Sequence, residues 1–252
     1  ALTAPSFASS ATSTGGLYEF VKLDGTSIVV AISGGKFYTL RGATIAEDLT
    51  AAQLSAASVA IQSNAIVYMT TFNNQLVVSD GTNTPWMWDG TAGGGITELT
   101  NAPVAYGPPA VYYAKLFWIK NTDRGTIVWS EENAAHTGYE AGGYNNAWTL
   151  SQTASEPLVA LGGTNEYLFF GRTTGCGLIR GAVTSTFTST GTHDAVSDVV
   201  GVGHPVSFTV IGDLIAFADQ AGRPWFVKGG QLVDIAGGQF DRTFCGQVST
   251  PP

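Results

Sequence analysis

Short β-strand patterns, separated by turns rich in glycine, recur along the whole 252-residue chain. When the units are aligned on their second strand, the equivalent positions are Ile28, Leu76, Leu116, Leu168 and Leu214, which lie 48, 40, 52 and 46 residues apart. A repeat of about 40–50 residues with three or four short strands is typical of a β-propeller blade, since one such sheet buries its faces only against its neighbours. We therefore predict an all-β propeller of about five blades with antiparallel sheets, or six if the loops contain another.

The first unit shows the pattern most clearly. Residues 17–23 and 27–32 flank Asp24-Gly25-Thr26, and Asp-Gly is a strong signal for a type I′ hairpin turn, whose two central residues need positive φ. Gly34-Gly35 then turns the chain into residues 36–40. The later predicted strands are 66–72, 75–79, 85–88, 96–99, 110–119, 126–130, 157–161, 167–170, 177–180, 205–210, 214–218, 224–227 and 231–235. Glycine pairs such as Gly162-Gly163 are interpreted as corners between strands.

The Ala-rich segment 44–62 departs from this pattern. Thr44 followed by Glu47 resembles a capping box and favours a short helix. An edge strand around Leu49 followed by a loop is the competing interpretation. The predicted domain organisation is a flexible N-terminal arm at 1–14, a propeller at 15–245 and a C-terminal tail at 246–252.

Composition supports an all-β domain and limits its partners. Only 12% of the residues are charged, against about 25% in an average globular protein, and there are 32 glycines. The net charge is −8, whereas binding to nucleic-acid phosphates needs clustered Lys and Arg, so no sequence-specific nucleic-acid binding is expected. No run of 18 apolar residues occurs, so no membrane span is expected. Two other all-β folds explain the sequence less well. Two β-sandwiches would need a linker between them, and a β-solenoid would need a repeat of 20–25 residues; neither feature is found in the sequence.

The residue types that most often carry chemistry are sparse. The three histidines, His136, His193 and His204, are predicted on loops without zinc-site spacing. Asp80 and Asn83 could bind Ca²⁺ together with backbone carbonyls, although a simple turn is the preferred interpretation. Glu131 and Glu132 are adjacent and have no evident partner carboxylate, as glycoside hydrolysis would need. We therefore predict no catalytic, cofactor-binding or metal-binding residues, no cofactor and no enzymatic activity.

The aromatic residues and cysteines are assigned to the core. Five tryptophans lie within predicted strands and are expected to pack between blades, although a carbohydrate-binding surface is the alternative; they are Trp86, Trp88, Trp118, Trp129 and Trp225. Cys176 and Cys245 are expected to be small buried residues, and whether they pair stays open.

Several of these segments resemble the β-propeller proteins of phage tails, the nozzle or hub-like structural proteins of short-tailed bacteriophages. The segments that carry the resemblance are 16–20 with 24–26, 31–38, 72–85 with Asp89-Gly90, 115–118 with 126–130, and 210–235. The resemblance implies a structural subunit of the virion tail, in a homo-oligomeric ring with other tail subunits, and a place along the DNA exit path is one option. It implies no catalytic residues. The alternative function is a secreted, lectin-like propeller.

Overall fold

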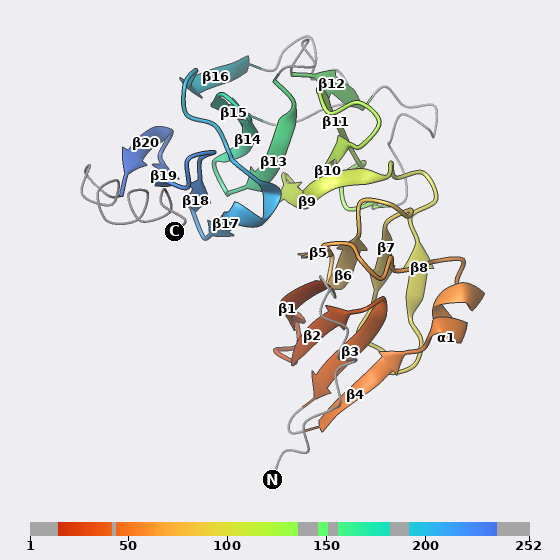
Figure 1. Ribbon diagram of the computed structural model, residues 1–252. Helices are drawn as coiled ribbons and strands as arrows, with labels where there is room; N and C mark the ends of the chain where they lie inside the picture. Colours follow the sequence, from red (N-terminus) through yellow and green to blue (C-terminus); the bar gives the residue numbers. More distant parts are fainter. Residues whose placement is uncertain (1–14, 42–43, 136–145, 151–155, 182–191, 236–252) are drawn as a thin grey trace, which may run out of the picture.

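A computed structural model describes residues 15–41, 44–135, 146–150, 156–181 and 192–235. These residues form five four-stranded antiparallel sheets, and in each sheet the strands lie side by side in the order in which they occur along the chain. The sheets are arranged as the successive blades of a β-propeller (Figure 1). The predicted fold class is therefore confirmed, with five blades in the described part of the chain.

The blades are numbered in chain order. Blade 1 consists of β1 (Gly15–Val21), β2 (Ser27–Ser33), β3 (Lys36–Arg41) and β4 (Thr44–Leu49), and blade 2 of β5 (Tyr68–Phe72), β6 (Gln75–Ser79), β7 (Trp86–Trp88) and β8 (Ile96–Glu98). Blade 3 consists of β9 (Ala105–Tyr112), β10 (Lys115–Lys120), β11 (Thr126–Trp129) and β12 (Ala147–Thr149). Blade 4 consists of β13 (Leu158–Gly163), β14 (Tyr167–Arg172), β15 (Cys176–Arg180) and β16 (Thr192–Ser197), and blade 5 of β17 (Phe208–Ile211), β18 (Leu214–Ala218), β19 (Pro224–Lys228) and β20 (Gln231–Asp234).

The five aligned positions, Ile28, Leu76, Leu116, Leu168 and Leu214, all lie in the second strand of their blade. The repeat read from the sequence was therefore in the correct phase. The predicted arm at 1–14 and the tail at 246–252 lie outside the described residues, as do His136 and Cys245.

The first strand of each blade is the innermost one. β1 contacts β5, β5 contacts β9, β9 contacts β13, and β13 contacts β17. Among the described strands, no comparable contact joins β17 to β1. Figure 1 accordingly shows an arc of sheets that has blade 1 at one end and blade 5 at the other.

Apolar side chains on alternating strand positions fill the spaces between neighbouring blades. In β2, Ile28, Val30 and Ile32 are buried and belong to the cluster that joins blade 1 to blade 2. The buried tryptophans occupy the same kind of position: the rings of Phe37 and Trp88 meet edge to face with their centroids 5.0 Å apart. The prediction of tryptophans between blades is confirmed for Trp86, Trp88, Trp118 and Trp129, which are at most 2% exposed, whereas Trp225 is only partly buried.

The turns between strands differ in part from the predicted ones. Gly34-Gly35 has positive φ at both residues, as a type I′ turn requires. Asp24-Gly25 does not form such a turn, because only Gly25 has positive φ and the loop runs from residue 22 to 26. There the Asp24 carboxylate accepts the Thr26 N–H at 2.8 Å. Asp-Gly here marks a longer loop that is closed by a side chain.

One predicted strand is divided by an unexpected turn. Residues 110–119 were expected to be continuous, but β9 ends at Tyr112 and β10 begins at Lys115. Tyr113 and Ala114 have φ values of 48° and 52°, so they form a tight turn without glycine or asparagine. The Tyr113 ring packs edge to face on Tyr112 at 4.7 Å, which compensates part of the backbone strain.

Both interpretations of segment 44–62 were partly correct. Residues 44–49 form the edge strand β4, and the short helix α1 (Ala51–Ala56) follows it directly. The capping box is formed by Thr50 and Gln53, six residues after the predicted pair Thr44 and Glu47. Thr44 and Glu47 instead belong to the edge strand β4 and cap no helix.

Candidate functional site

The inner strands surround a central channel, which is the main candidate site of the described residues. Its cavity has a volume of about 620 Å³. All five blades contribute to its wall, through residues 15, 17 and 18 of β1, 66–71 at β5, 108–111 of β9, 161–163 of β13, and 205, 206 and 208–210 at β17. A propeller places any ligand or passing polymer on this axis, so the chemistry of the wall bears directly on function.

The channel wall is made of apolar, hydroxyl and backbone groups. None of its described lining residues is Asp, Glu, His, Lys or Arg. The Tyr18 hydroxyl and Thr71 Oγ1 form a hydrogen bond of 3.0 Å between blades 1 and 2. Burial raises the pKa of Tyr68 to about 12, and the nearby Tyr106 adds to the effect, so this hydroxyl stays neutral near pH 7. This wall therefore offers hydrogen bonds but no pair of carboxylates for acid–base catalysis.

Glycines in the inner strands permit the close spacing around the channel. Gly162 and Gly163 end strand β13 and do not form the predicted corner, because the turn lies at residues 164–166. A Cβ on Gly163 would overlap the Val111 carbonyl oxygen of blade 3, and a Cβ on Gly162 would overlap the Phe208 ring of blade 5. The Gly-Gly pair therefore lets the inner strands of blades 3, 4 and 5 approach one another.

Asp80 lies in the loop between β6 and β7 and is 7% exposed. Its Oδ1 accepts the backbone N–H groups of Thr82 and Asn83 at 2.9 and 2.8 Å. Its Oδ2 accepts the Gln62 N–H and the Asn83 side-chain amide, both at 2.7 Å. Because the four donors occupy the carboxylate and Asn83 directs its amide N–H groups at it, this geometry fits a structural corner and does not fit a Ca²⁺ site.

The two described histidines lie in different elements, β16 and the turn before β17. His193 was expected on a loop but lies in the edge strand β16, where its ring meets that of Trp148 at 5.6 Å. His204 lies on a loop, as predicted, and its Nδ1 accepts the Val206 N–H at 3.3 Å. In the ranges that the structure covers, no three His, Cys, Asp or Glu side chains converge as a metal site would require.

Glu131 contacts a lysine and an asparagine side chain. Its Oε2 lies 3.6 Å from Lys115 Nζ and its Oε1 accepts the Asn146 side-chain amide at 3.0 Å. Glu132 is exposed. Glu131 thus compensates the positive charge of Lys115, which is only 6% exposed, and so has a structural role.

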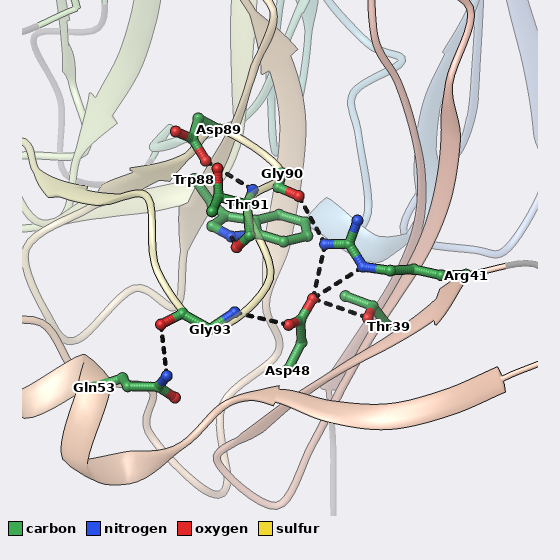
Figure 2. Close-up of polar contacts among 9 residues, drawn as sticks. All are labelled: Thr39, Arg41, Asp48, Gln53, Trp88, Asp89, Gly90, Thr91 and Gly93. Atoms are coloured by element: carbon green, nitrogen blue, oxygen red, sulfur yellow. Dashed lines mark hydrogen bonds and ion pairs between the residues drawn. The ribbon is translucent and has the colours of Figure 1, made fainter.

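A polar junction at the outer side of blades 1 and 2 joins these blades (Figure 2). Asp48 at the end of β4 accepts hydrogen bonds from Thr39 Oγ1 at 3.0 Å and Arg41 Nη2 at 2.9 Å. Its other oxygen accepts the Gly93 N–H at 3.0 Å, and Arg41 also donates to the Gly90 carbonyl at 2.7 Å. The loop between β7 and β8 is therefore tied to blade 1 by one aspartate and one arginine.

Replacing Asp48 by asparagine is expected to lower the free energy of unfolding by about 2 kcal/mol. The substitution removes the charge that compensates Arg41 and turns an amide toward its guanidinium. The cost stays below that of a fully buried pair because the Arg41 side chain is 37% exposed. Chemical denaturation measures the change. Glu47→Gln breaks the exposed Lys36–Glu47 pair instead and is the matched control, for which a loss of at most about 0.5 kcal/mol is expected.

Alkaline pH is expected to destabilise the chain. Burial is the main cause that raises the pKa of Tyr68 and of Tyr112 to about 12, from about 10 when unfolded. The folded state therefore holds these protons more tightly, so this stability is complete below pH 10 and is lost as pH rises toward 12. The loss should grow steadily between pH 10 and 12, and both tyrosines should contribute to it. Thermal unfolding between pH 8 and 11.5 should show this slope, and Tyr68→Phe should reduce it; an unchanged slope would contradict the assignment.

The two ends of the arc carry apolar sheet faces that no other described blade covers. Alternate residues of each strand face a neighbouring blade, and the intervening residues face away from it. We call the set that faces away in blade 1 the blade 1 outer face: Leu17, Glu19, Val21, Ser27, Val29, Ala31, Ser33, Lys36, Tyr38, Leu40, Ile45 and Glu47. The corresponding set in blade 5 is the blade 5 outer face: Thr209, Ile211, Leu214, Ala216, Ala218, Pro224, Phe226, Lys228, Gln231 and Val233.

Exposure is high along the edges of both faces, whereas central residues such as Ala31 and Phe226 are half-buried. Leu17 and Val21 are 76% and 50% exposed, whereas Phe20, on the opposite side of the same strand, is fully buried. Ile211 and Val233 are 63% and 48% exposed. The sequence could not show which sheet faces are exposed. The strands of an end blade carry apolar residues on both sides, as do the strands of a blade that has two neighbours.

Comparisons with known proteins agree with the fold and do not identify a family. No protein-family model and no curated protein matches the chain. Among solved structures, a virginiamycin B lyase from Staphylococcus aureus superposes with a TM-score of 0.55 at 14% identity, over 90% of this chain and 70% of the lyase. The computationally designed protein Ika8 gives 0.53 at 15% identity, over 88% and 60%, and YCF48 from Cyanidioschyzon merolae gives 0.52 at 11% identity, over 81% and 67%.

These likenesses support a β-propeller and carry no information on activity, because all identities are 15% or lower. This chain spans 60 to 70% of the length of the three structures. In the described part of the chain, no helix combines the length and apolar character needed to cross a membrane.

Proposed function

We propose that this chain is a structural subunit that works by packing against other protein chains, in the tail of a bacteriophage. The observation that carries the assembly role is the pair of uncovered apolar outer faces on blades 1 and 5. Soluble monomers rarely leave an extended apolar sheet face in water, so such a face indicates a protein partner. The assignment to a phage tail comes from the sequence resemblance.

The channel wall supports the same proposal. A wall without charged side chains has no groups that grip the phosphates of a nucleic acid, so a polymer can pass along it without being held. The proposal assigns no catalytic step to the chain. Carbohydrate binding receives no comparable support, since Trp86, Trp88, Trp118 and Trp129 are buried and their rings cannot stack on a sugar.

Analysis of purified phage particles tests the proposal. Mass spectrometry of virions from a host that produces the phage encoding this chain should detect it at a stoichiometry of several copies per particle. Immunogold labelling should place it at the tail. Absence from intact virions, with the chain present only in the free soluble fraction, would refute the proposed function.

A further inference from the structure

We infer that a pocket at one end of the propeller, between blades 3 and 4, binds a neutral saccharide against the ring of Tyr113. The pocket has a volume of about 310 Å³ and is lined by Val111, Tyr112, Tyr113, Ala114, Thr164 and Asn165. This volume is at the lower end of the range for small-molecule sites, so it suits a small ligand. The inference goes beyond the proposed function and does not depend on it, because that proposal gives this pocket no role.

The pocket lies where the inner hairpin turns of two neighbouring blades come together, that is, the turns between the first and second strands. Tyr113-Ala114 joins β9 to β10 in blade 3, and residues 164–166 join β13 to β14 in blade 4. The corresponding turn of blade 5, Gly212-Asp213, lies beside them, because Asn165 Nδ2 is 3.5 Å from Asp213 Oδ1. Three consecutive blades thus present an aromatic ring, an amide and a carboxylate at the same end of the propeller.

The Tyr113-Ala114 turn is strained in a way that the fold does not require. Its two residues have φ values of 48° and 52°, which disfavour most residues that carry a Cβ. At the same place, blade 2 has Asn73-Asn74 and blade 5 has Gly212-Asp213, and the positive φ values there fall on asparagine and glycine, which tolerate them. Strain that another residue type would relieve indicates a role for the tyrosine itself.

The Tyr113 ring is accessible and also held in place. The residue is 50% exposed, and its ring meets that of Tyr112 edge to face with the centroids 4.7 Å apart. Tyr112 is itself fixed, because it is 2% exposed and its hydroxyl lies 3.4 and 3.3 Å from the carbonyl oxygens of Glu166 and Gly181. Tyr113 therefore offers a preorganised ring, which lowers the entropic cost of binding.

An aromatic ring beside polar groups suits the two-sided chemistry of a sugar. The C–H groups on the apolar face of a sugar carry partial positive charge and are attracted to the negative face of an aromatic ring. The sugar hydroxyls need partners that both donate and accept, and the exposed Asn165 amide does both. The buried tryptophans of the core take no part in this site.

The charges around the pocket favour a neutral ligand. None of the six lining residues is Asp, Glu, His, Lys or Arg. Glu166 and Asp213, on the turns beside the pocket, are exposed and acidic. An anionic ligand would meet like charge here and would find no cation among the lining residues to compensate it.

The backbone of the blade 4 turn is occupied by its own hydrogen bonds. Thr164 Oγ1 accepts the N–H groups of Glu166 and Tyr167 at 3.3 and 3.1 Å. The Thr164 N–H donates to the Tyr167 carbonyl oxygen at 2.9 Å. Peptide recognition by strand addition depends on backbone partners, whereas a sugar is bound through side chains, so these contacts favour the sugar.

Titration of the full chain with sugars, followed by NMR, tests the inference. The sugars are glucose, galactose, mannose and N-acetylglucosamine, with the acidic sugar N-acetylneuraminate for comparison. The wild-type chain should bind at least one neutral sugar, and more tightly than the acidic one. Tyr113→Asn removes the ring and keeps a residue type that tolerates positive φ. It should weaken binding roughly tenfold or more and leave the melting temperature unchanged or higher.

Three further variants separate the ring from the fold and the pocket from the channel. Tyr113→Phe keeps the ring and should bind within about threefold of the wild-type affinity. Asn165→Ala removes the amide and should weaken binding about threefold or more. Val206→Ser changes a residue of the channel wall that is 58% exposed and should leave sugar binding unchanged. Circular dichroism confirms that each variant is folded.

A wild-type chain that binds none of the neutral sugars would overturn the inference, as would a folded Tyr113→Asn variant with the wild-type affinity. Preferred binding of the acidic sugar would refute the ligand class. Loss of binding in folded Val206→Ser would place the ligand in the channel and would also contradict the site. If Tyr113→Asn sharply lowered the melting temperature, the ring would serve stability, and the argument from strain would fail.

Discussion

Replacing Gly163 by alanine is expected to lower the free energy of unfolding by about 3 kcal/mol or more. The new Cβ would overlap the Val111 carbonyl oxygen across the contact between β13 and β9. The carbonyl oxygen belongs to the backbone of one inner strand and the Cβ is fixed rigidly to the backbone of the other, so neither can move away as the end of a flexible side chain could. The inner strands of blades 3 and 4 would have to separate, which disturbs the packing on both sides.

Urea denaturation of the Gly163→Ala variant measures this loss. Gly94→Ala is the matched control, because a Cβ on Gly94 meets no atom within 4 Å and its φ lies outside the left-handed region. That control is expected to change stability by less than about 0.5 kcal/mol. If the two variants were equally stable, the close approach of the inner strands would be refuted.

Asp80→Ala is expected to cost about 3 kcal/mol. The carboxylate accepts four hydrogen bonds in a loop where it is 7% exposed, and one of them fixes Gln62, which lies 18 residues earlier. Removing the acceptor leaves several partly buried N–H groups without a partner. Asp80→Asn should also destabilise the chain, because an amide presents a donor to donors.

Thermal and urea unfolding of these variants measure the effect, with Asp24→Ala as the control. Asp24 occupies a similar Asp-Gly-Thr sequence but is exposed, and the hydrogen bond recorded for its side chain goes to Thr26, within its own loop. The control should unfold almost as the wild-type chain does. A Ca²⁺-dependent rise in the melting temperature that Asp80→Ala abolishes would instead restore the metal-site interpretation.

The blade repeat was accessible from the sequence because it depends on local signals. Strands of alternating or continuous apolar residues and their turns each occupy a few positions, so the phase of the repeat follows from five aligned residues such as Leu76 and Leu168. The turn at Tyr113-Ala114 was missed because it has no local signal. Neither residue type favours positive φ, and the packing of the Tyr113 ring on Tyr112 is visible only in three dimensions.

The glycines show a second limit of local signals. Gly34-Gly35 and Gly162-Gly163 look alike in the sequence, but the first pair forms a turn with positive φ and the second lies in an inner strand. What distinguishes them is the backbone of another blade, Val111, more than fifty residues away. The uncovered outer faces were inaccessible for a similar reason, since exposure of Leu17 and Ile211 depends on which blades are adjacent.

The central claim is that blades 1 and 5 do not cover each other within one chain. A double variant, Leu17→Cys with Ile211→Cys, tests it in a Cys245→Ser background, where the remaining Cys176 is buried and its pKa is raised to about 12 by burial. After mild oxidation, mass spectrometry of the monomer should find no disulfide between positions 17 and 211, because blades 1 and 5 of one chain do not contact each other through these faces. Complete loss of free thiols at monomer mass would mean that the ring closes within the chain, and would contradict the account.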